Sequence, residues 1–392
     1  MGFRFRIFFS WLIAILFSTA SFGSTSTHTT TKSTKRDAKV AESARAQRHM
    51  SRLRHSRKLR AVRLKKRHRY VERFSTSSYA TDITEGDVVA GEDPIVRQAA
   101  IDALGDMNGT MVAIDPSSGR ILAMVNQKLA LSGGAQPCST IKLAVALAAL
   151  SEKIITRDTE VSLGRQQMTL TEALAKSNNA FFEALGRRLG FSKVSYYAHQ
   201  FGLGEYAGWD MDGEHVGVFP NRVLDAKLGG VGKMCSFGES ISVTPLQLGA
   251  LVSAIANGGT LYYMQHPLTS QEVLDFQPKI KRQLDIQSLI PEMTDGMMGA
   301  VEYGTARSLR QSFIEEEILG KTGTCSKDGT RFGWFASYAN TQYGRIVAVV
   351  FLQGGRPTYG PKAAELTGKF YRSLYDHNFF TQPATSASTN NQ

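Results

Sequence analysis

Ser139 and Lys142, a serine and a lysine three residues apart, are the residues of this sequence whose types and spacing point most directly to chemistry. Residues three apart lie on one face of a helix, so the Lys142 amine could reach the Ser139 hydroxyl. A serine hydroxyl becomes a good nucleophile when a nearby base takes its proton, and lysine acts as a base only when it is neutral. The same spacing also fits an N-cap serine followed by a solvated lysine.

The residues around this pair predict the element that positions it. A loop with Gly133, Gly134 and Pro137 precedes Ser139, and an Ala/Leu-rich stretch follows over residues 143–150. We therefore expect a helix that begins at or next to Ser139. The first turn of a helix has free N–H groups, which could stabilise an oxyanion.

Two further polar motifs follow along the chain. Ser177-x-Asn179 interrupts an apolar helical pattern, which favours either the caps of a broken helix or a polar site in a cleft. Lys321-Thr322-Gly323-Thr324 lies in a β-prone stretch. Each motif is ordinary when considered alone, and a Lys-Thr-Gly sequence often forms a plain exposed turn.

The remaining pattern predicts an α+β domain. Along the chain, most of the expected helices lie between an early hairpin of apolar, β-prone segments and three late strands. We therefore expect an antiparallel sheet with strands from both ends of the domain. The expected helices are residues 93–104, a helix opened by Thr169, a helix from Thr244 to about residue 255, 287–301 and 362–375; the expected strands are 110–114, 121–125, 319–324, 332–338 and 346–351.

The ends of the chain differ from its middle in composition. Residues 1–23 have the charged, apolar and small-residue order of a signal peptide or membrane anchor. We expect residues 24–85 to form a Ser/Thr-rich and basic linker. Residues 32–73 have a net charge of +14, whereas the whole chain has +12, so the other residues sum to −2. We assign residues 86–380 to the folded domain and 381–392 to a disordered tail.

The cysteines and histidines favour no metal site. The three cysteines allow at most one disulfide, and no Cys/His cluster has zinc-ligand spacing. We expect neither a metal nor a cofactor. Cys138 precedes Ser139 directly, but Lys142 is in register with Ser139, so we expect Ser139 to be the nucleophile and the variant Cys138→Ala to retain most of the reactivity of Ser139.

Taken together, the three motifs resemble those of the penicilloyl-serine transferases, and residues 90–377 resemble the transpeptidase domain of penicillin-binding proteins. Gly333-Trp334-Phe335 and the Thr244-Pro245 segment agree with this resemblance. The family usually has glycine where this chain has Cys138. The resemblance implies an antiparallel sheet flanked by helices, as in β-lactamases, beside an all-helical lobe.

The resemblance also implies a role for each motif residue. Ser139 would attack a D-Ala-D-Ala carbonyl, and Lys142 would be its general base. Ser177 would relay the proton to the leaving amine, Asn179 would hold the substrate backbone, and Lys321 would polarise Ser177. The substrate carboxylate would lie near Thr322, Gly323 and Thr324, and the backbone N–H groups of Ser139 and Thr324 would form the oxyanion hole.

The function implied is a serine D,D-transpeptidase that uses peptidoglycan stem peptides and reacts with β-lactams. A D,D-carboxypeptidase, a serine β-lactamase and a non-catalytic penicillin-sensing or envelope-binding module remain open. The implied location is the periplasmic or envelope side of the inner membrane. Residues 35–73 would bind anionic envelope polymers or a membrane surface; nucleic acid is not expected as a partner, because aromatic interleaving and nucleic-acid fold motifs are missing.

Overall fold

The computed structural model describes residues 42–54 and 73–381, and the chain divides into a unit of residues 1–71 and a unit of residues 72–392. In the first unit, residues 42–54 form a mostly exposed helix. The expected signal peptide or anchor lies outside the described residues, as do most of the basic segment and the C-terminal tail beyond residue 381. No helix within the described ranges is long and apolar enough to cross a membrane.

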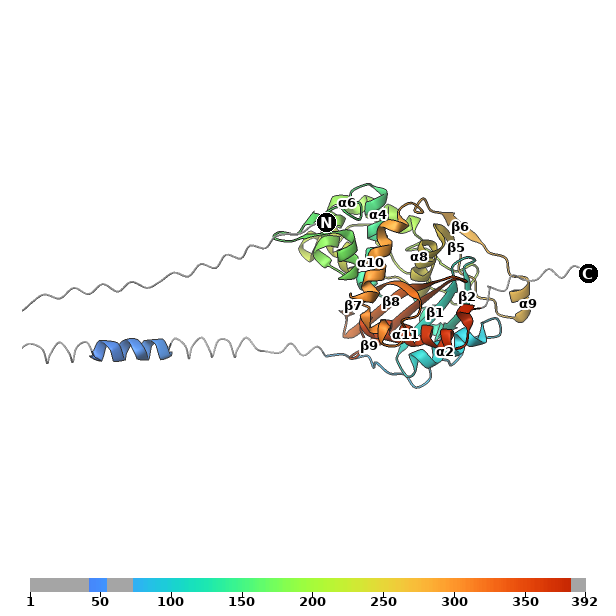
Figure 1. Cartoon of the computed structure of the whole chain (residues 1–392), viewed down its shortest axis with the longest axis horizontal. Helices are drawn as coiled ribbons and strands as arrows, with labels where there is room; N and C mark the ends of the chain where they lie inside the picture. The colour runs from blue at the N-terminus through green and yellow to red at the C-terminus, as the bar shows by residue number, and fades with distance from the viewer. Residues whose placement is uncertain (1–41, 55–72, 382–392) are drawn as a thin grey trace, which may run out of the picture. The chain divides into compact units, whose positions relative to one another are not determined.

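The second unit is built on a five-stranded antiparallel sheet with strand order β2-β1-β9-β8-β7 (Figure 1). The expected sheet, with strands from both ends of the domain, is confirmed. The strands are β1 (Gly109–Asp115), β2 (Arg120–Val125), β7 (Glu317–Lys327), β8 (Thr330–Thr341) and β9 (Gly344–Gly354), with two small ladders of β3 (Val161–Ser162) with β4 (Gln167–Met168) and β5 (Thr260–Tyr262) with β6 (Ile280–Gln283).

Helices pack on both faces of this sheet and form a lobe beside it (Figure 1). The α-helices are α2 (Pro94–Leu104), α3 (Gln127–Ala130), α4 (Lys142–Ser151), α5 (Leu170–Ala175), α6 (Asn179–Gln200), α7 (Gly230–Phe237), α8 (Pro245–Asn257), α9 (Ser270–Leu274), α10 (Ile290–Glu302) and α11 (Gly360–Asp376). Four 3₁₀ turns complete the described elements: η1 (Cys138–Ile141), η2 (Ala226–Leu228), η3 (Arg307–Gln311) and η4 (Phe379–Thr381).

The alternation of side chains along β9 explains why helices cover both faces of the sheet. Val347 and Val349 join one buried cluster, which includes residues of α4, α6 and α8. Ala348 and Val350 join the other, which includes residues of α2 and α11. Since successive strand residues point to opposite faces, an apolar run on a central strand requires a cover on each side.

Polar side chains cap the starts of α2 and α8. Asp93 caps α2 by accepting from the N–H groups of Ile95 and Val96. Thr244 and Gln247 form a reciprocal capping box at the start of α8, with Pro245 in its first turn. These caps fix where the buried helices begin, and α8 lies directly against the sheet.

Residues 75–80, which the sequence analysis places in the linker, are bonded to the folded unit. The Ser75 N–H donates to the Gly329 carbonyl, and the Ser78 hydroxyl accepts from the Gly355 N–H, at 2.9 and 2.8 Å. Tyr79 forms an isolated bridge with Met107. The Ser/Thr-rich composition suggested a solvated segment, but here a serine hydroxyl and backbone groups bond to loops at the ends of the strands.

Candidate functional site

The three polar motifs meet at one place, although they come from separate parts of the fold. Ser139 lies in η1, directly before α4; Ser177 and Asn179 lie at the junction of α5 and α6; Lys321 lies on β7, an edge strand of the sheet. Lys142 and Lys321 are both 0% exposed, whereas Ser139 is half-buried. The site is therefore a buried pair of amines beside a partly accessible hydroxyl.

The Lys142 amine contacts each of the three polar residues Ser139, Ser177 and Asn179. Its Nζ lies 2.9 Å from Ser139 Oγ, 2.6 Å from Asn179 Oδ1, and 2.8 and 3.1 Å from the carbonyl oxygen and Oγ of Ser177. The Asn179 oxygen and the Ser177 carbonyl can only accept. A neutral amine donates two N–H groups to those two acceptors and keeps its lone pair for the Ser139 hydroxyl proton. This arrangement suits a base for Ser139.

Lys321 completes the network from the sheet. Its Nζ donates to Ser177 Oγ at 2.8 Å and to the Thr322 carbonyl at 3.0 Å. The Ser177 hydroxyl thus lies between two lysine side chains. This hydroxyl is therefore in position to pass a proton that leaves Lys142.

Burial lowers the pKa of both lysine side chains, and for Lys142 the charge of Lys321 adds to the effect. Desolvation first, and then the charge of Lys321, lower the pKa of Lys142 to about 6, against the opposing pull of Glu183. Desolvation lowers the pKa of Lys321 to about 7. Because the two groups interact, they titrate as a pair, and both ammonium forms are disfavoured together at neutral pH.

The Lys-Thr-Gly-Thr segment is fitted closely against the nucleophile turn. A Cβ added to Gly323 would lie 2.8 Å from the Pro137 carbonyl oxygen, so only glycine allows β7 to approach this far. The Trp334 indole donates to the Gln136 carbonyl at 3.0 Å from the neighbouring strand β8. These contacts hold residues 136–138 against the sheet.

Cys138 and Cys325 form a disulfide, the one bridge that three cysteines allow, whereas the sequence left the redox state of the cysteines open. Their Cα atoms are 5.5 Å apart, although 187 residues separate them in sequence. The free cysteine among the described residues, Cys235, is buried. A sulfur in a disulfide has no proton to lose and cannot act as the nucleophile, which leaves Ser139 in that position.

Thr305 is a site residue that the sequence analysis missed. Its hydroxyl lies 2.6 Å from the Thr322 hydroxyl, and its N–H donates to the Ala175 carbonyl at 3.2 Å. Gly304 makes this approach possible, since a Cβ there would lie 2.2 Å from the Ala175 carbonyl oxygen. The Gly304-Thr305 dipeptide after a helix was the available signal, but such a dipeptide marks any helix end. Of the expected substrate-binding residues, Thr324 accepts from the Gly360 N–H at 2.8 Å.

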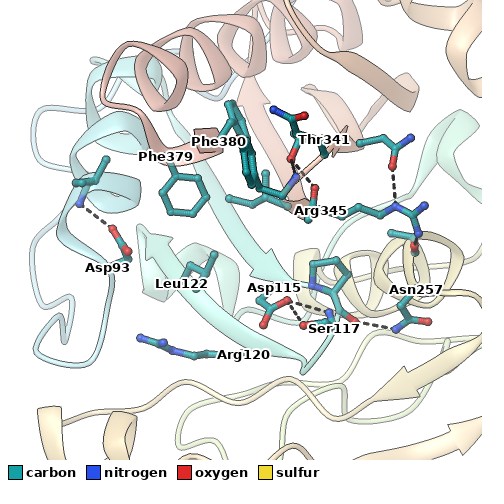
Figure 2. Close-up of a pocket in the computed structure, with 18 of the residues that line it drawn as sticks. Asp93, Asp115, Ser117, Arg120, Leu122, Asn257, Thr341, Arg345, Phe379 and Phe380 are labelled. Atoms are coloured by element: carbon teal, nitrogen blue, oxygen red, sulfur yellow. Dashed lines mark hydrogen bonds between the residues drawn. The ribbon is translucent and has the colours of Figure 1, made fainter. Parts of the chain in front are cut away.

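A separate cavity of about 790 Å³ lies away from these motifs (Figure 2). The turn after β1, the turn between β8 and β9, and η4 line it; Ser117, Arg345 and Phe380 are representative. The motif residues of the candidate site do not line this cavity.

Replacing Lys142 by methionine should expose its low pKa as a pH dependence of stability. In the unfolded chain a lysine keeps its proton up to its ordinary pKa of 10.5, whereas folded Lys142 loses it near 6. The unfolded state binds more protons between these values, so wild-type stability relative to Lys142→Met should rise with pH there, by up to about 1.4 kcal/mol per pH unit. Urea unfolding at several pH values measures this difference.

The exposed Lys176, which pairs with Glu172, provides the control. Lys176→Met should differ from wild type by a nearly constant amount across the same range. A pH-independent difference for Lys142→Met as well would show that Lys142 is protonated in the folded state.

Comparison with known proteins agrees with this site. Residues 109–372 match the family described as the penicillin binding protein transpeptidase domain. Stage V sporulation protein D of Bacillus subtilis is 31% identical over 261 residues, covering 55% of this chain and 39% of that protein. Peptidoglycan D,D-transpeptidase MrdA of Escherichia coli K12 is 26% identical over 372 residues, covering 79% of this chain and 55% of that protein.

The fold agrees with a solved structure as well. A crystal structure of Pseudomonas aeruginosa PBP2 in complex with WCK 5153 superposes with a TM-score of 0.60 at 23% identity, covering 74% of this chain and 78% of that chain. The chain spans about half or less of the length of the curated relatives named here. With the family match extending over most of the folded unit and the motifs meeting in one buried network, the chain belongs to the penicillin-binding protein transpeptidase family.

Proposed function

We propose that this chain is a serine D,D-transpeptidase that cross-links peptidoglycan by way of an acyl-enzyme. The observation that carries the proposal is the position of the buried Lys142 amine, within hydrogen-bond distance of Ser139, Ser177 and Asn179 at once. One relative reported above carries the name peptidoglycan D,D-transpeptidase MrdA, and the family match covers all three motifs.

Acylation begins with attack of Ser139 Oγ on the carbonyl of the penultimate D-Ala. Lys142 Nζ takes the hydroxyl proton as the bond forms, which is the role its free lone pair suits. The negative charge moves to the carbonyl oxygen. The backbone N–H groups of Ser139 and Thr324 are the proposed donors to this oxyanion, and such donors often supply the largest single electrostatic contribution to acyl transfer.

Collapse of the tetrahedral species then breaks the peptide bond. The leaving D-Ala amine needs a proton, which passes from Lys142 through the Ser177 hydroxyl, and Lys321 polarises that hydroxyl from the other side. Asn179 positions the substrate backbone, and Thr322, Gly323 and Thr324 border the carboxylate position. An amine of a second stem peptide then attacks the acyl carbonyl and gives up a proton through Ser177 to Lys142. The new amide bond forms as the Ser139 Oγ–carbonyl bond breaks, and Lys142 returns the proton to Ser139 Oγ.

Benzylpenicillin should acylate Ser139 and form a long-lived adduct. Its leaving amine stays tethered after ring opening, so it blocks the approach of an acceptor. Ser139→Ala should give no adduct, and Lys142→Ala should acylate about 10²–10⁴-fold more slowly because proton transfer is lost. Ser177→Ala should slow acylation less. Intact-mass spectrometry of the mixed samples measures all of these.

Ser132→Ala and Lys176→Ala are the matched controls, since Ser132 bonds the Leu129 carbonyl and Lys176 pairs with Glu172. Both should acylate like wild type. An adduct that disappears within seconds with excess hydrolysed drug would indicate a β-lactamase. Absence of any adduct in wild type would indicate a non-catalytic binding module. Release of D-Ala without cross-linked product would indicate a carboxypeptidase.

We further propose an envelope location outside the cytoplasm, where the stem peptides are, with residues 35–73 bound to anionic envelope polymer or lipid head groups. Its support is the +14 charge over residues 32–73 and the exposure of the described helix, residues 42–54. Exposed charges are screened within roughly 8 Å at physiological ionic strength, so this binding should weaken with salt.

Sedimentation with cell-wall sacculi, and separately with vesicles containing anionic lipid, tests the basic segment. Deleting residues 35–71 should abolish co-sedimentation, and replacing Arg45, Arg48, Arg52 and Arg54 by glutamine should weaken it partly. Penicillin labelling should not change in either variant. Co-sedimentation that is unchanged by the deletion would contradict the proposal.

A further inference from the structure

The Cys138–Cys325 disulfide has no part in the chemistry described above, yet it lies at the centre of the site. Cys138 directly precedes the nucleophile, and Cys325 directly follows Thr324. The bridge therefore joins the two residues next to the proposed oxyanion-hole donors. One donor belongs to η1 and the other to β7, so the bridge is a covalent link between two separate elements of the site.

The backbone conformation at Cys138 is unfavourable for a residue with a Cβ atom, so a covalent restraint there can affect the geometry of the site. Cys138 has φ of 52°, in the left-handed region that residues with a Cβ disfavour. A glycine at this position, which is usual in the family, would adopt such a conformation without steric penalty. A cysteine does not, so the turn that presents Ser139 needs restraint from outside.

The other contacts of the turn restrain different atoms. Trp334 holds the Gln136 carbonyl, and Gly323 packs against the Pro137 carbonyl, both upstream of Cys138. Lys142 holds the Ser139 side chain from the helical side. The Pro137 carbonyl also accepts from the Thr140 N–H and hydroxyl, at 3.1 and 2.7 Å, and the Cys138 side chain is fully buried. The bridge adds a covalent link at Cys138 itself, whose peptide carbonyl carbon is bonded to the Ser139 nitrogen.

We propose that the Cys138–Cys325 disulfide is a positioning element for acylation, which holds the backbone N–H of Ser139 in place relative to that of Thr324. This inference rests on the proposed function. Opening the bridge lets Cys138 leave the left-handed region and turns the Ser139 N–H away from the oxyanion. Misplacement by about 1 Å can reduce a rate about 10²-fold.

Reduction by a dithiol opens the bridge in two balanced steps. A reductant thiolate attacks Cys325 Sγ, the half-buried sulfur, and the S–S bond breaks so that Cys138 leaves as a thiolate and takes up a proton. The second thiol of the reductant then attacks the mixed disulfide, closes its own ring and releases the Cys325 thiol. Two electrons pass from the dithiol to the protein.

If the disulfide only stabilises the fold, a different result is expected. Closing a loop of 187 residues restricts the unfolded chain, and its loss would lower the unfolding temperature while leaving the rate of the folded enzyme unchanged. The two roles are separated by measuring the rate on folded protein and by resolving binding from chemistry.

The test uses the full-length protein, oxidised and after dithiothreitol treatment, with thiols counted by maleimide mass labelling and folding checked by circular dichroism. Acylation by a fluorescent penicillin is followed over a range of drug concentrations. The expected result is a limiting acylation rate about 10- to 100-fold lower after reduction, with affinity changed less than about twofold. Reoxidation should restore the rate.

Variants separate the bridge from other effects of the reductant. The double variant Cys138→Ala with Cys325→Ala should have the limiting acylation rate of reduced wild type, and dithiothreitol should not change that rate. This result would revise the expectation from the sequence that Cys138→Ala keeps most acylation. Cys138→Gly with Cys325→Ala should recover part of the rate, because glycine adopts the required φ freely. Cys235→Ala should behave as wild type in both states.

Equal limiting rates for oxidised and reduced wild type, with only a lower unfolding temperature after reduction, would overturn the inference. The disulfide would then stabilise the fold without positioning the oxyanion-hole donors. A reduced affinity at an unchanged limiting rate would overturn it too. If oxidised wild type forms no adduct, the proposed function fails, and this inference fails with it.

Discussion

Two amines buried side by side set the central constraint of this structure. Lys142 and Lys321 are both fully buried and share the Ser177 hydroxyl. Taking a charged ammonium out of water is expensive, and a second one nearby adds repulsion. Both pKa values are lowered, to about 6 for Lys142 and about 7 for Lys321, so the neutral amine forms are favoured near neutral pH. A neutral lysine in contact with a serine hydroxyl is the consequence, and it is what the proposed chemistry needs.

The fold supplies that burial by bringing distant segments together. Helix α4 is buried along nearly its whole length, and Lys142 at its start is fully buried with it. Strand β7 closes the other side from the C-terminal part of the chain. The left-handed backbone of Ser177, with φ of 53°, turns its carbonyl and hydroxyl toward Lys142 before Asn178 caps α6. Cys138 and Ser177 are two of the eight non-glycine residues with positive φ in the described part of the chain, and both lie at the site.

The sequence predicted the parts that depend on local patterns. The Ser139–Lys142 register follows from helical spacing, and the strands follow from apolar, β-prone runs bounded by turn residues. The resemblance then assigned the three motifs to one cleft, where the structure brings Ser139, Lys142, Ser177, Asn179 and Lys321 into contact. The disulfide and Thr305 were not predicted, because each depends on a tertiary approach: 187 residues separate the cysteines, and Thr305 reaches Thr322 only through the packing of Gly304 on Ala175.

The most direct test of the account is the pH dependence of Ser139 acylation, measured as the single-turnover rate with a β-lactam whose own ionisation stays constant. If Lys142 is the buried base, the rate should rise with a midpoint near pH 6, several units below the ordinary lysine pKa of 10.5, and Lys142→Ala should remove this rise. A rate that stays low until the pH approaches 10, or a midpoint near 6 that persists in Lys142→Ala, would contradict the claim that a neutral Lys142 activates Ser139.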